Sequence, residues 1–496
     1  MVVTVAEALS LAIDHHQCGR LDEAESIYRQ ILVVEPREPV ALHNLGVIYH
    51  LKGDTSRAIA AYRMAIDVQP QYLDAYMNLA TALKYEAKYE EAIAIFQRLV
   101  EVKRDDANLF NLLGLCYSAL DRYSDAEQSF RKATDINSNS AEYFNNLGYA
   151  VRLSGRYEEA LVYFHRALLL NNDYVEAQGN LSHVLLGMGD YQRGFHEYEQ
   201  TRLKAGVIVK SVYPPPWNGE PLSGKRICLI SEEGLGDTIQ FIRFAKELKV
   251  RGAHVTLSVQ KTLVKLLGSV DGIDCVSHGQ IALDTFDYYT MLMSIPRVLA
   301  TGLEDISRTL SVPYIVPDPE YLQYWSDRLG TRNNRELRVG IAWQGNPDHG
   351  HDRHRSVALS KFLSLASVPG IKFYILQKNK GIEQLEPLRG QLPICDLPDE
   401  PDRESDSFSD TAALMSLMDL VLTVDSSPVH LAGALGVPTW LLCSFNAEWR
   451  WLRDREDSPW YPTVRIFRQA KFNEWDEVFE RICSELSRFH SSVKCE

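Results

Sequence analysis

A 34-residue period is the feature of this sequence that most limits its fold. An aromatic residue recurs at that interval through the first two-fifths of the chain, at Tyr28, Tyr62, Phe96, Phe130, Phe164 and Tyr198. A small residue comes four positions before each of them, at Ala24, Ala58, Ala92, Ala126, Ala160 and Gly194. A leucine followed by Ala, Gly or Ser keeps the same register, with the leucines at Leu11, Leu45, Leu79, Leu113, Leu147 and Leu181. Repeats of this length bury their apolar faces only by stacking, so the period predicts a solenoid.

Across residues 4–205, the Leu-Gly, Ala and Phe/Tyr positions resemble those of the tetratricopeptide repeat family. We expect five full repeats and a less regular sixth, with Pro36 and Pro70 ending the first two. The small residues let the two helices of a repeat approach closely, while the aromatics and leucines fill the seam between neighbours. A curved array of this kind has a concave binding face, so we expect it to hold a protein or peptide.

Asparagine precedes the repeat leucine in four of the units. These residues are Asn44, Asn78, Asn146 and Asn180, and Leu112 interrupts the series. The tetratricopeptide resemblance implies that this position lies on the inner helix and faces the groove. An asparagine ladder there can clamp an extended peptide backbone through amide donors and acceptors. The alternative is that each side chain contacts only water or its neighbour.

Length and charge exclude several classes of partner. A chain of 496 residues is too long for one core, so we expect about two to four domains. The net charge of −14 argues against nucleic acid or an anionic membrane as a partner, because those partners need clustered Lys and Arg.

The N-terminal segment lacks the basic region and cleavage pattern of a signal peptide, and no run approaches the roughly 18 apolar residues of a membrane span. Eight cysteines without a C-x-x-C pair indicate neither a zinc cage nor a disulfide scaffold, and we expect a cytoplasmic protein.

A proline-rich linker separates the repeats from a different pattern. We place the linker at residues 206–225, because residues 212–225 alone carry four prolines and two glycines. Trp217 is expected to pack the repeats against the domain after the linker. Residues 226–319 then form a first Rossmann-like half. Its opening order is strand, glycine turn, helix and strand, at 226–231, 232–237, 238–250 and 253–259, which predicts a parallel sheet.

The turn at residues 232–237, EEGLGD, brings a carboxylate to a helix N-terminus. It lacks the third glycine of a dinucleotide fingerprint and has no Walker lysine. Asp237 is either a general base for a hydroxyl or a helix cap, and one carboxylate can do both. Glu232 and Glu233 are competing carboxylates.

The rest of the first Rossmann-like half has fewer sequence features that predict secondary structure. A second Rossmann-like half follows it. Residues 284–299 are interpreted as a loop and a helix, and residues 313–319 close the half. We place the second Rossmann-like half at residues 336–488. Its expected strands lie at 337–343, 371–378, 420–424 and 439–443, and an amphipathic helix at 473–488 ends it.

A basic loop comes directly after the first strand of this second half. It contains His349, His351, Arg353, His354 and Arg355. Three histidines within six residues raise a metal hypothesis, but no cysteine lies nearby and the spacing fits no ligand motif, so we predict no metal site. In an acidic protein, Arg353 and Arg355 are better interpreted as a phosphate clamp capable of bidentate contacts. A solvated surface loop is the alternative.

Two further loops should reach the same edge of the sheet. Gln377 and Lys378 lie at the end of the strand at 371–378, and Asp425 ends the strand at 420–424. Ser427 is predicted to cap a short helix with Pro428 in its first position. In a doubly wound sheet this turn lies at the carboxyl ends of the strands, where free helix amides favour phosphate. The segment 419–443 therefore predicts an anion site.

Three motifs taken in order resemble the family 9 glycosyltransferases, the heptosyltransferase group. They are the GLGD turn, the W-x-G-N-P loop and the D-S-S-P-V-H-L-A-x-A-L-G motif, within residues 226–485. The resemblance implies a GT-B fold of two Rossmann-like halves, with a nucleotide-sugar held mainly by the second and no metal or other cofactor. It matches Asp237 to the family's catalytic base. It matches Asp425, Ser426, Ser427 and His430 to the segment contacting the donor diphosphate, places Arg353 or Arg355 near its phosphate-binding cation, and puts Gln377 near the nucleotide.

The chain departs from that family in two ways. Ser426 and Ser427 stand where Thr-Gly is usual, which makes close backbone approach to phosphate less assured. The first half is also short for the family, so the region that grips an acceptor is reduced. We expect the helical array to bind the acceptor instead. A repeat array fused to a GT-B domain is similar to protein O-glycosyltransferases that hold polypeptide in their superhelix.

The leading expectation is an inverting transfer of a sugar from a nucleotide-sugar donor to an acceptor hydroxyl on a protein. In it Asp237 takes the hydroxyl proton, while His430, the amides of residues 426–430 and an arginine stabilise the leaving diphosphate. One alternative is a transferase of cell-surface glycan, such as a lipopolysaccharide-type acceptor, with the repeats as a docking platform. The other is a non-catalytic scaffold with a degenerate transferase half.

Overall fold

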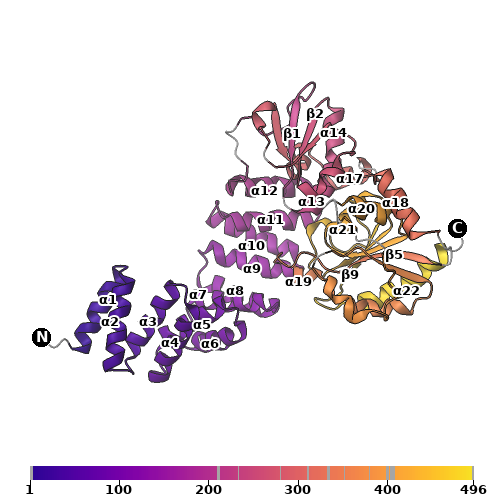
Figure 1. Ribbon diagram of the computed structural model, residues 1–496. Helices are drawn as coiled ribbons and strands as arrows, with labels where there is room; N and C mark the ends of the chain where they lie inside the picture. The colour runs from indigo at the N-terminus through magenta and orange to yellow at the C-terminus, as the bar shows by residue number, and fades with distance from the viewer. Residues whose placement is uncertain are drawn as a thin grey trace. The chain divides into compact units, whose positions relative to one another are not determined.

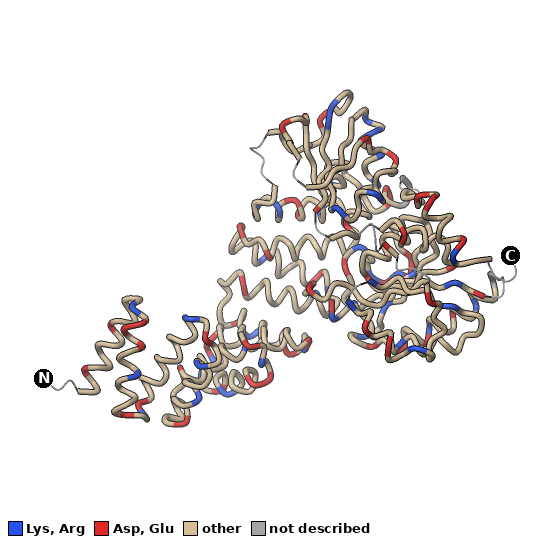
Figure 2. Tube along the Cα trace, in the orientation of Figure 1, with Lys and Arg blue, Asp and Glu red and all other residues tan. Residues whose placement is uncertain are grey.

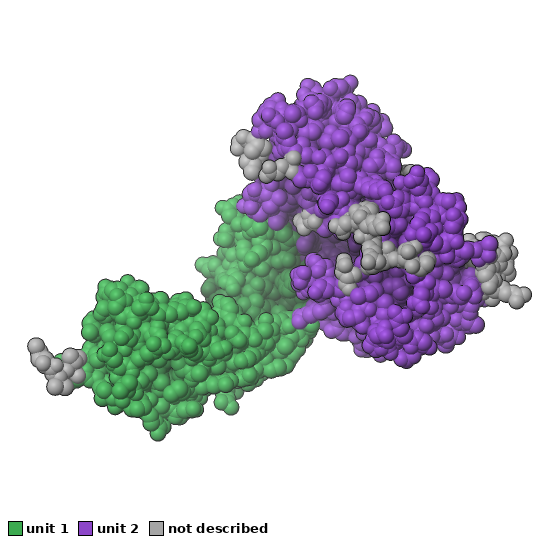
Figure 3. All heavy atoms as spheres, in the orientation of Figure 1, with its two compact units in different colours: residues 1–180 green, residues 181–496 purple. Residues whose placement is uncertain are grey.

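The computed structural model describes residues 4–208, 213–232, 234–279, 281–309, 312–331, 336–350, 352–378, 380–397, 401–402 and 408–493. The chain divides into two compact units, residues 1–180 and residues 181–496 (Figure 3). Lys and Arg are interspersed with Asp and Glu along the helices of the first unit and around the sheets of the second (Figure 2). In the part of the chain that is described, no helix is both long enough and apolar enough to cross a membrane.

Twelve α-helices follow one another through the described residues 4–208, as expected for a helical repeat array (Figure 1). Through α10, consecutive helices pack as pairs, and each pair packs on the next. The bounds of the twelve are α1 Val5–Gln17, α2 Leu21–Val34, α3 Pro39–Leu51, α4 Thr55–Val68, α5 Leu73–Tyr85, α6 Tyr89–Val102, α7 Ala107–Ala119, α8 Tyr123–Ile136, α9 Ala141–Leu153, α10 Tyr157–Leu170, α11 Val175–Gly187 and α12 Tyr191–Lys204. The predicted helical array is therefore confirmed.

The repeat positions build the core of this array. The predicted aromatics are all buried. In three repeats, the glycine that follows the repeat leucine in the preceding helix leaves room for the aromatic ring. A Cβ atom added to Gly114 would lie 2.6 Å from the ring of Phe130, and one added to Gly46 would lie equally close to Tyr62. Leu11 is the exception among the leucines, at 48% exposed.

Two parallel sheets with helices around them make up the second unit (Figure 1). The first has the order β3-β2-β1-β4, with β1 Arg226–Ile230, β2 His254–Ser258, β3 Cys275–Ser277 and β4 Tyr288–Met291. The second has the order β6-β5-β7-β8-β9, with β5 Leu337–Ala342, β6 Ile371–Ile375, β7 Leu420–Val424, β8 Thr439–Cys443 and β9 Val464–Arg468. Every strand pair in both sheets is parallel. The α/β class predicted for this part of the chain is confirmed.

Short helices connect these strands. The α-helices are α13 Leu235–Phe241, α14 Ala245–Val250, α15 Val264–Leu267, α16 Ile295–Val298, α17 Leu303–Thr309, α18 Pro319–Leu329, α19 Asp352–Arg355, α20 Ser409–Ser416, α21 Ser427–Ala434 and α22 Asp476–Val493. The 3-10 helices are η1 Ile242–Phe244, η2 Lys261–Leu263, η3 Leu283–Thr285, η4 Leu292–Ser294, η5 Leu359–Ser367, η6 Ile382–Gln384, η7 Glu386–Leu388 and η8 Trp449–Trp451.

The structure corrects several predicted elements. Residues 284–299 were expected to be a loop and a helix, but they contain β4, which pairs with β1. The Asp287 carboxylate accepts hydrogen bonds from Lys225 Nζ at 3.0 Å and the Arg226 amide at 2.8 Å, which anchors a strand too short and polar to show as an apolar run. The helix expected at 238–250 begins earlier and is broken into α13, η1 and α14.

The last repeat helix, α12, belongs to the second unit. It packs on η4 and α16, and Tyr198 Oη donates to Met293 Sδ at 3.6 Å. Trp217 is fully buried in the same apolar cluster, and its amide donates to the Tyr289 carbonyl at 2.8 Å. The boundary between the compact units thus falls at residues 180–181, before the predicted linker. Apolar burial attaches α12 to the first sheet.

Candidate active site of the second unit

Asp237 lies in the first turn of α13, directly after β1. Its Oδ2 atom accepts a hydrogen bond from the Gly234 amide at 2.9 Å, so the carboxylate does cap the helix. Its Oδ1 atom forms an ion pair with Arg450. The side chain remains 20% exposed. Asp237 is therefore held at both oxygens while keeping access to solvent.

The competing carboxylate Glu232 has a different role. Its Oε1 atom accepts the Met293 amide at 2.9 Å, and its Oε2 atom forms a buried ion pair with Arg202 of α12. Arg202 also donates to Ser294 Oγ at 3.1 Å. Glu232 thus ties α12 to the end of β1. Glu233 lies outside the described residues.

Arg450 lies on η8, in the loop that comes after β8. Its side chain is 10% exposed, Nε donates to Gln240 Oε1 at 2.7 Å, and Nη1 lies 3.5 Å from Glu448 Oε2. The sequence shows that this segment is dense in Trp and Arg, but that pattern does not single out Arg450. The residue joins the loop of the second sheet to α13 of the first.

α21 begins just after β7, in the second sheet of the unit. Its N-cap is Ser426, so the prediction of Ser427 as cap is wrong by one residue: Ser427 is the first helical residue and Pro428 the second. The Ser426 side chain donates to the Val424 carbonyl at 3.4 Å and caps no first-turn amide. The N-terminal end of α21 therefore keeps the partial positive charge of an uncapped helix.

His430 is enclosed where α13 and α21 pack together. Its Nδ1 atom lies 2.9 Å from Tyr461 Oη, and its ring stacks on Trp451 at a centroid distance of 5.5 Å. A Cβ atom added to Gly236 would lie 2.6 Å from His430 Cδ2, so the glycine is what lets the two helices approach. Burial lowers the pKa of His430 well below its usual value, and the nearby cations Arg450, Arg243 and Arg355 lower it further. The imidazole is thus neutral at physiological pH.

Asp425, at the end of β7, is buried close to the same cations. Burial raises its pKa, the neighbouring Glu448 raises it further, and Arg355, Trp451 and Arg450 oppose the rise. Arg355 itself donates from Nε to Asp352 Oδ1 at 3.1 Å. The structure therefore brings Asp237, His430, Asp425, Arg355 and Arg450 into one electrostatic cluster.

The remaining predicted donor residues make other contacts. Gln377 Oε1 accepts the Trp343 amide at 3.0 Å and the Gln344 amide at 2.9 Å, and its Nε2 donates to the Lys380 carbonyl at 2.9 Å. This amide holds the loop after β5 to the loop after β6. Lys378 forms an ion pair with Asp402.

The basic loop shows no metal centre in the part that is described. Arg353 is exposed, and its Nε lies 3.1 Å from His354 Nε2. No group of three His, Cys, Asp or Glu side chains able to hold a metal ion occurs among the described residues. His351 lies outside them.

The asparagines of the first unit form rungs between successive repeats. Asn78 Nδ2 lies 2.8 Å from His43 Nε2, Asn146 Nδ2 donates to Asn111 Oδ1 at 2.9 Å, and Asn180 Nδ2 donates to Asn145 Oδ1 at 3.0 Å. Asn44 lies beside His43 and is half-buried. Each rung joins a predicted position to the residue 35 positions before it. The side chains thus contact their neighbours and also remain partly exposed.

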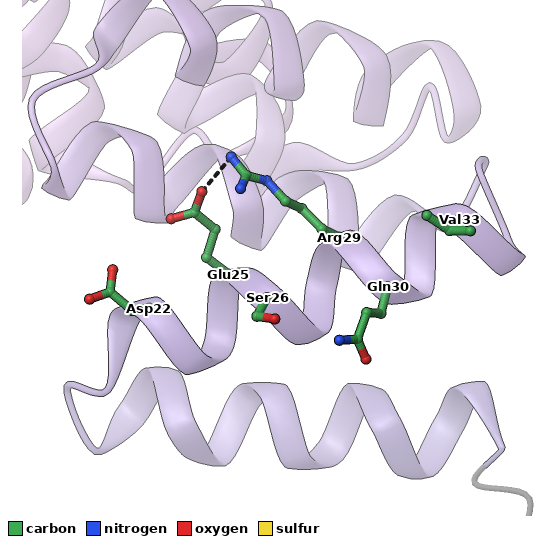
Figure 4. Close-up of a pocket in the computed structure, with 6 residues that line it drawn as sticks. All are labelled: Asp22, Glu25, Ser26, Arg29, Gln30 and Val33. Carbon is green, nitrogen blue, oxygen red and sulfur yellow. Dashed lines mark ion pairs between the residues drawn. The ribbon is translucent and has the colours of Figure 1, made fainter.

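A separate hollow lies on the surface of α2. It is lined by Asp22, Glu25, Ser26, Arg29, Gln30 and Val33 (Figure 4). Arg29 pairs with Glu25 at 2.6 Å, and Lys52 pairs with Asp22 and Glu25 at 2.5 Å each. None of the residues predicted from the sequence as functional lies there, and its charges are mutually paired.

Comparison with known proteins supports the repeat assignment. Residues 8–133 match the model of the cilia and flagella-associated protein 70 middle TPR-like domain, and residues 141–174 match the tetratricopeptide repeat model. Protein FlbA of Caulobacter vibrioides is 25% identical over 296 residues, which cover 56% of this chain and 48% of FlbA. The chain therefore spans about half the length of this curated relative.

Two solved structures are similar to part of the chain. Residues 41 to the end of MamA from Desulfovibrio magneticus RS-1 are 19% identical, with a TM-score of 0.33, covering 34% of this chain and 96% of that one. YrrB, described as a TPR protein with an unusual peptide-binding site, is 21% identical, with a TM-score of 0.34, covering 35% and 90%. The family-model matches at residues 8–133 and 141–174 support a tetratricopeptide-type repeat array with a role in protein interaction.

The buried imidazole generates a test of the site's packing. Because the folded pKa of His430 is depressed, the unfolded chain takes up a proton first, and stability should fall as the pH drops below about 6.5. Between pH 7.5 and 5.5 this one group should lower the free energy of unfolding by about 1 kcal/mol, because the unfolded chain binds a proton that the folded chain does not. Urea unfolding at the two pH values should therefore show a smaller pH effect in His430→Gln than in the wild type.

His278→Gln, on the exposed surface of the same unit, is the matched control for loss of an imidazole. An equal pH effect in the wild type and His430→Gln would contradict the enclosed, neutral ring.

Proposed function

We propose that residues 226–488 form a metal-independent, inverting glycosyltransferase of the GT-B type, and that the repeat array holds its acceptor, a protein. The donor is a nucleotide-sugar. One observation carries the proposal: a partly accessible carboxylate, Asp237, stands at the end of one parallel sheet against cationic groups and a helix N-terminus at the end of another. Carboxyl ends of parallel strands are where such folds bind ligands.

Asp237 is suited to act as the general base. In the proposed reaction the acceptor hydroxyl gives its proton to the Asp237 carboxylate while its oxygen bonds to the anomeric carbon. The bond from that carbon to the phosphate oxygen breaks, and its electron pair leaves with the nucleoside diphosphate. A carboxylate positioned within reach of the hydroxyl contributes about two to four powers of ten to such a step. The Asp237–Gly234 hydrogen bond fixes its orientation.

The leaving diphosphate needs positive groups, and the opposite side of the cluster supplies them. The uncapped first turn of α21 offers amides and a helix dipole. Arg355, which is held by Asp352, adds a guanidinium close to Asp425. Preorganised donors of this kind stabilise charge that develops in a transition state. His430, being enclosed and neutral, is suited to positioning α21 against α13.

The acceptor is proposed to be polypeptide bound along the asparagine rungs. Asn146 and Asn180 use their Nδ2 groups between repeats, and both residues remain partly exposed. An extended backbone presents N–H groups at regular spacing, which amide oxygens can accept. The family-model matches at residues 8–133 and 141–174, which include Asn44, Asn78 and Asn146, support a protein-binding role for the array.

The donor site is tested by a nucleotide screen. ADP, UDP, GDP and CDP and their sugars should be compared by thermal shift with the wild type and Arg355→Ala. A ligand at a hundred times its dissociation constant stabilises the folded state by about 2.7 kcal/mol, which is readily measured. We expect one nucleotide to bind selectively and the Arg355→Ala variant to bind it more weakly. Stabilisation by none of them would favour the scaffold alternative.

The acceptor site is tested by removing two rungs. Asn78→Ala combined with Asn146→Ala should weaken binding of a protein acceptor several-fold while leaving nucleotide affinity unchanged, because both residues lie in the repeat unit. Binding of peptide and of glycan fragments should be compared by calorimetry. Asn139→Ala, in an exposed loop between α8 and α9, is the matched control. Unaltered acceptor binding by the double variant would remove the rungs from the recognition surface.

A further inference from the structure

Arg450 occupies one oxygen of the proposed base. One Asp237 oxygen is engaged by the Arg450 guanidinium and the other by the Gly234 amide at 2.9 Å. Each Asp237 oxygen therefore already has one hydrogen-bond partner, and an acceptor hydroxyl would have to share Oδ1 with the Arg450 guanidinium.

Arg450 is a largely buried cation. The side chain is 10% exposed, and burial alone would lower its pKa. The neighbouring carboxylates Asp237, Glu448 and Asp425 outweigh that effect and leave its pKa raised, so the group stays cationic. Arg450 comes from the loop after β8, which belongs to the sheet whose α21 N-terminus is the proposed phosphate site.

A second donor beside the guanidinium has no partner. Gln240 is fully buried, and its Oε1 atom accepts from Arg450 Nε at 2.7 Å. Its Nε2 atom is buried without a hydrogen-bond partner among the residues that the structure describes. A buried donor without a partner is unfavourable, and a hydrogen bond to an incoming oxygen would remove that cost. Arg450 offers a planar guanidinium of the kind that matches phosphate, and Gln240 holds it through Nε.

We propose that Arg450 is a donor-binding residue that exchanges partners: the diphosphate of the nucleotide-sugar takes the guanidinium from Asp237, and Asp237 is thereby freed to act as the base. This inference rests on the proposed function and adds an order to it. The donor binds first, and the acceptor hydroxyl meets a competent base only afterwards. Before donor binding, the ion pair keeps the base inactive.

A static latch is the competing account of the same contact. In that case Arg450 only joins the two sheets, and its charge is permanently used by Asp237. The two accounts differ in the effect of neutralising Asp237. If Arg450 exchanges partners, Asp237 competes with the diphosphate, so its removal should tighten nucleotide binding. If Arg450 is a latch, removal of its partner should leave binding equal or weaker, because the contact positions α13 against the loop.

The experiment is a calorimetric titration of the full chain with UDP, GDP, ADP and CDP. The wild type, Asp237→Asn, Arg450→Gln and Arg450→Lys are compared, with Arg455→Gln as a control in the same segment, since Arg455 pairs with Asp457 at the surface. Loss of a charge-assisted hydrogen bond should weaken binding by Arg450→Gln about tenfold. Arg450→Lys should recover part of that loss, Asp237→Asn should bind several-fold more tightly than the wild type, and Arg455→Gln should match it.

Equal or weaker binding by Asp237→Asn would overturn the partner exchange, and that result stands even if the Arg450 variants fail to fold. Binding of no nucleotide by the folded wild type would instead overturn the proposed function. The two failures are therefore distinguishable.

Discussion

The close approach of α13 to α21 is the constraint on which the second unit depends. Gly236 has no side chain, and His430 fills the space that a Cβ would need. That contact brings the turn after β1 to the turn after β7, although almost 200 residues separate them in the sequence. The Tyr461 hydroxyl and the Trp451 ring complete the enclosure of the imidazole. Each group in the electrostatic cluster takes its place around this packed centre.

The same physical device builds the repeat array. Gly46, Gly114 and Gly148 each lie against the ring of an aromatic residue in the partner helix of the repeat. A Cβ atom at any of these positions would overlap the ring. Alanine occupies the equivalent position in other repeats and is fully buried there. Small residues thus set the spacing between helices in both units, and large rings supply the buried area. The asparagine rungs add polar contacts between repeats where the apolar seam ends.

The sequence predicted these features where a local pattern reports them. The 34-residue period was sufficient for the solenoid, and alternation of apolar strands with helices was sufficient for the parallel sheets. Asp237 was recognisable because a helix cap after a glycine turn is a local signal. By contrast, β4 is four residues long and takes its anchorage from Asp287, which only the paired strand β1 reveals. Arg450 could not be found in this way, since its partner lies 213 positions away. The segment around Arg450 is dense in Trp and Arg, but this pattern does not single out Arg450.

The central claim is that Asp237 serves as the base of a sugar transfer. The most direct measurement is turnover of the nucleotide-sugar selected by binding, followed as release of nucleoside diphosphate with and without acceptor. Release by the wild type should be lost in Asp237→Asn while that variant still binds the nucleotide. Asp287→Asn, a carboxylate that anchors β4 away from the cluster, serves as the matched control. Turnover by Asp237→Asn at the wild-type rate would contradict the account.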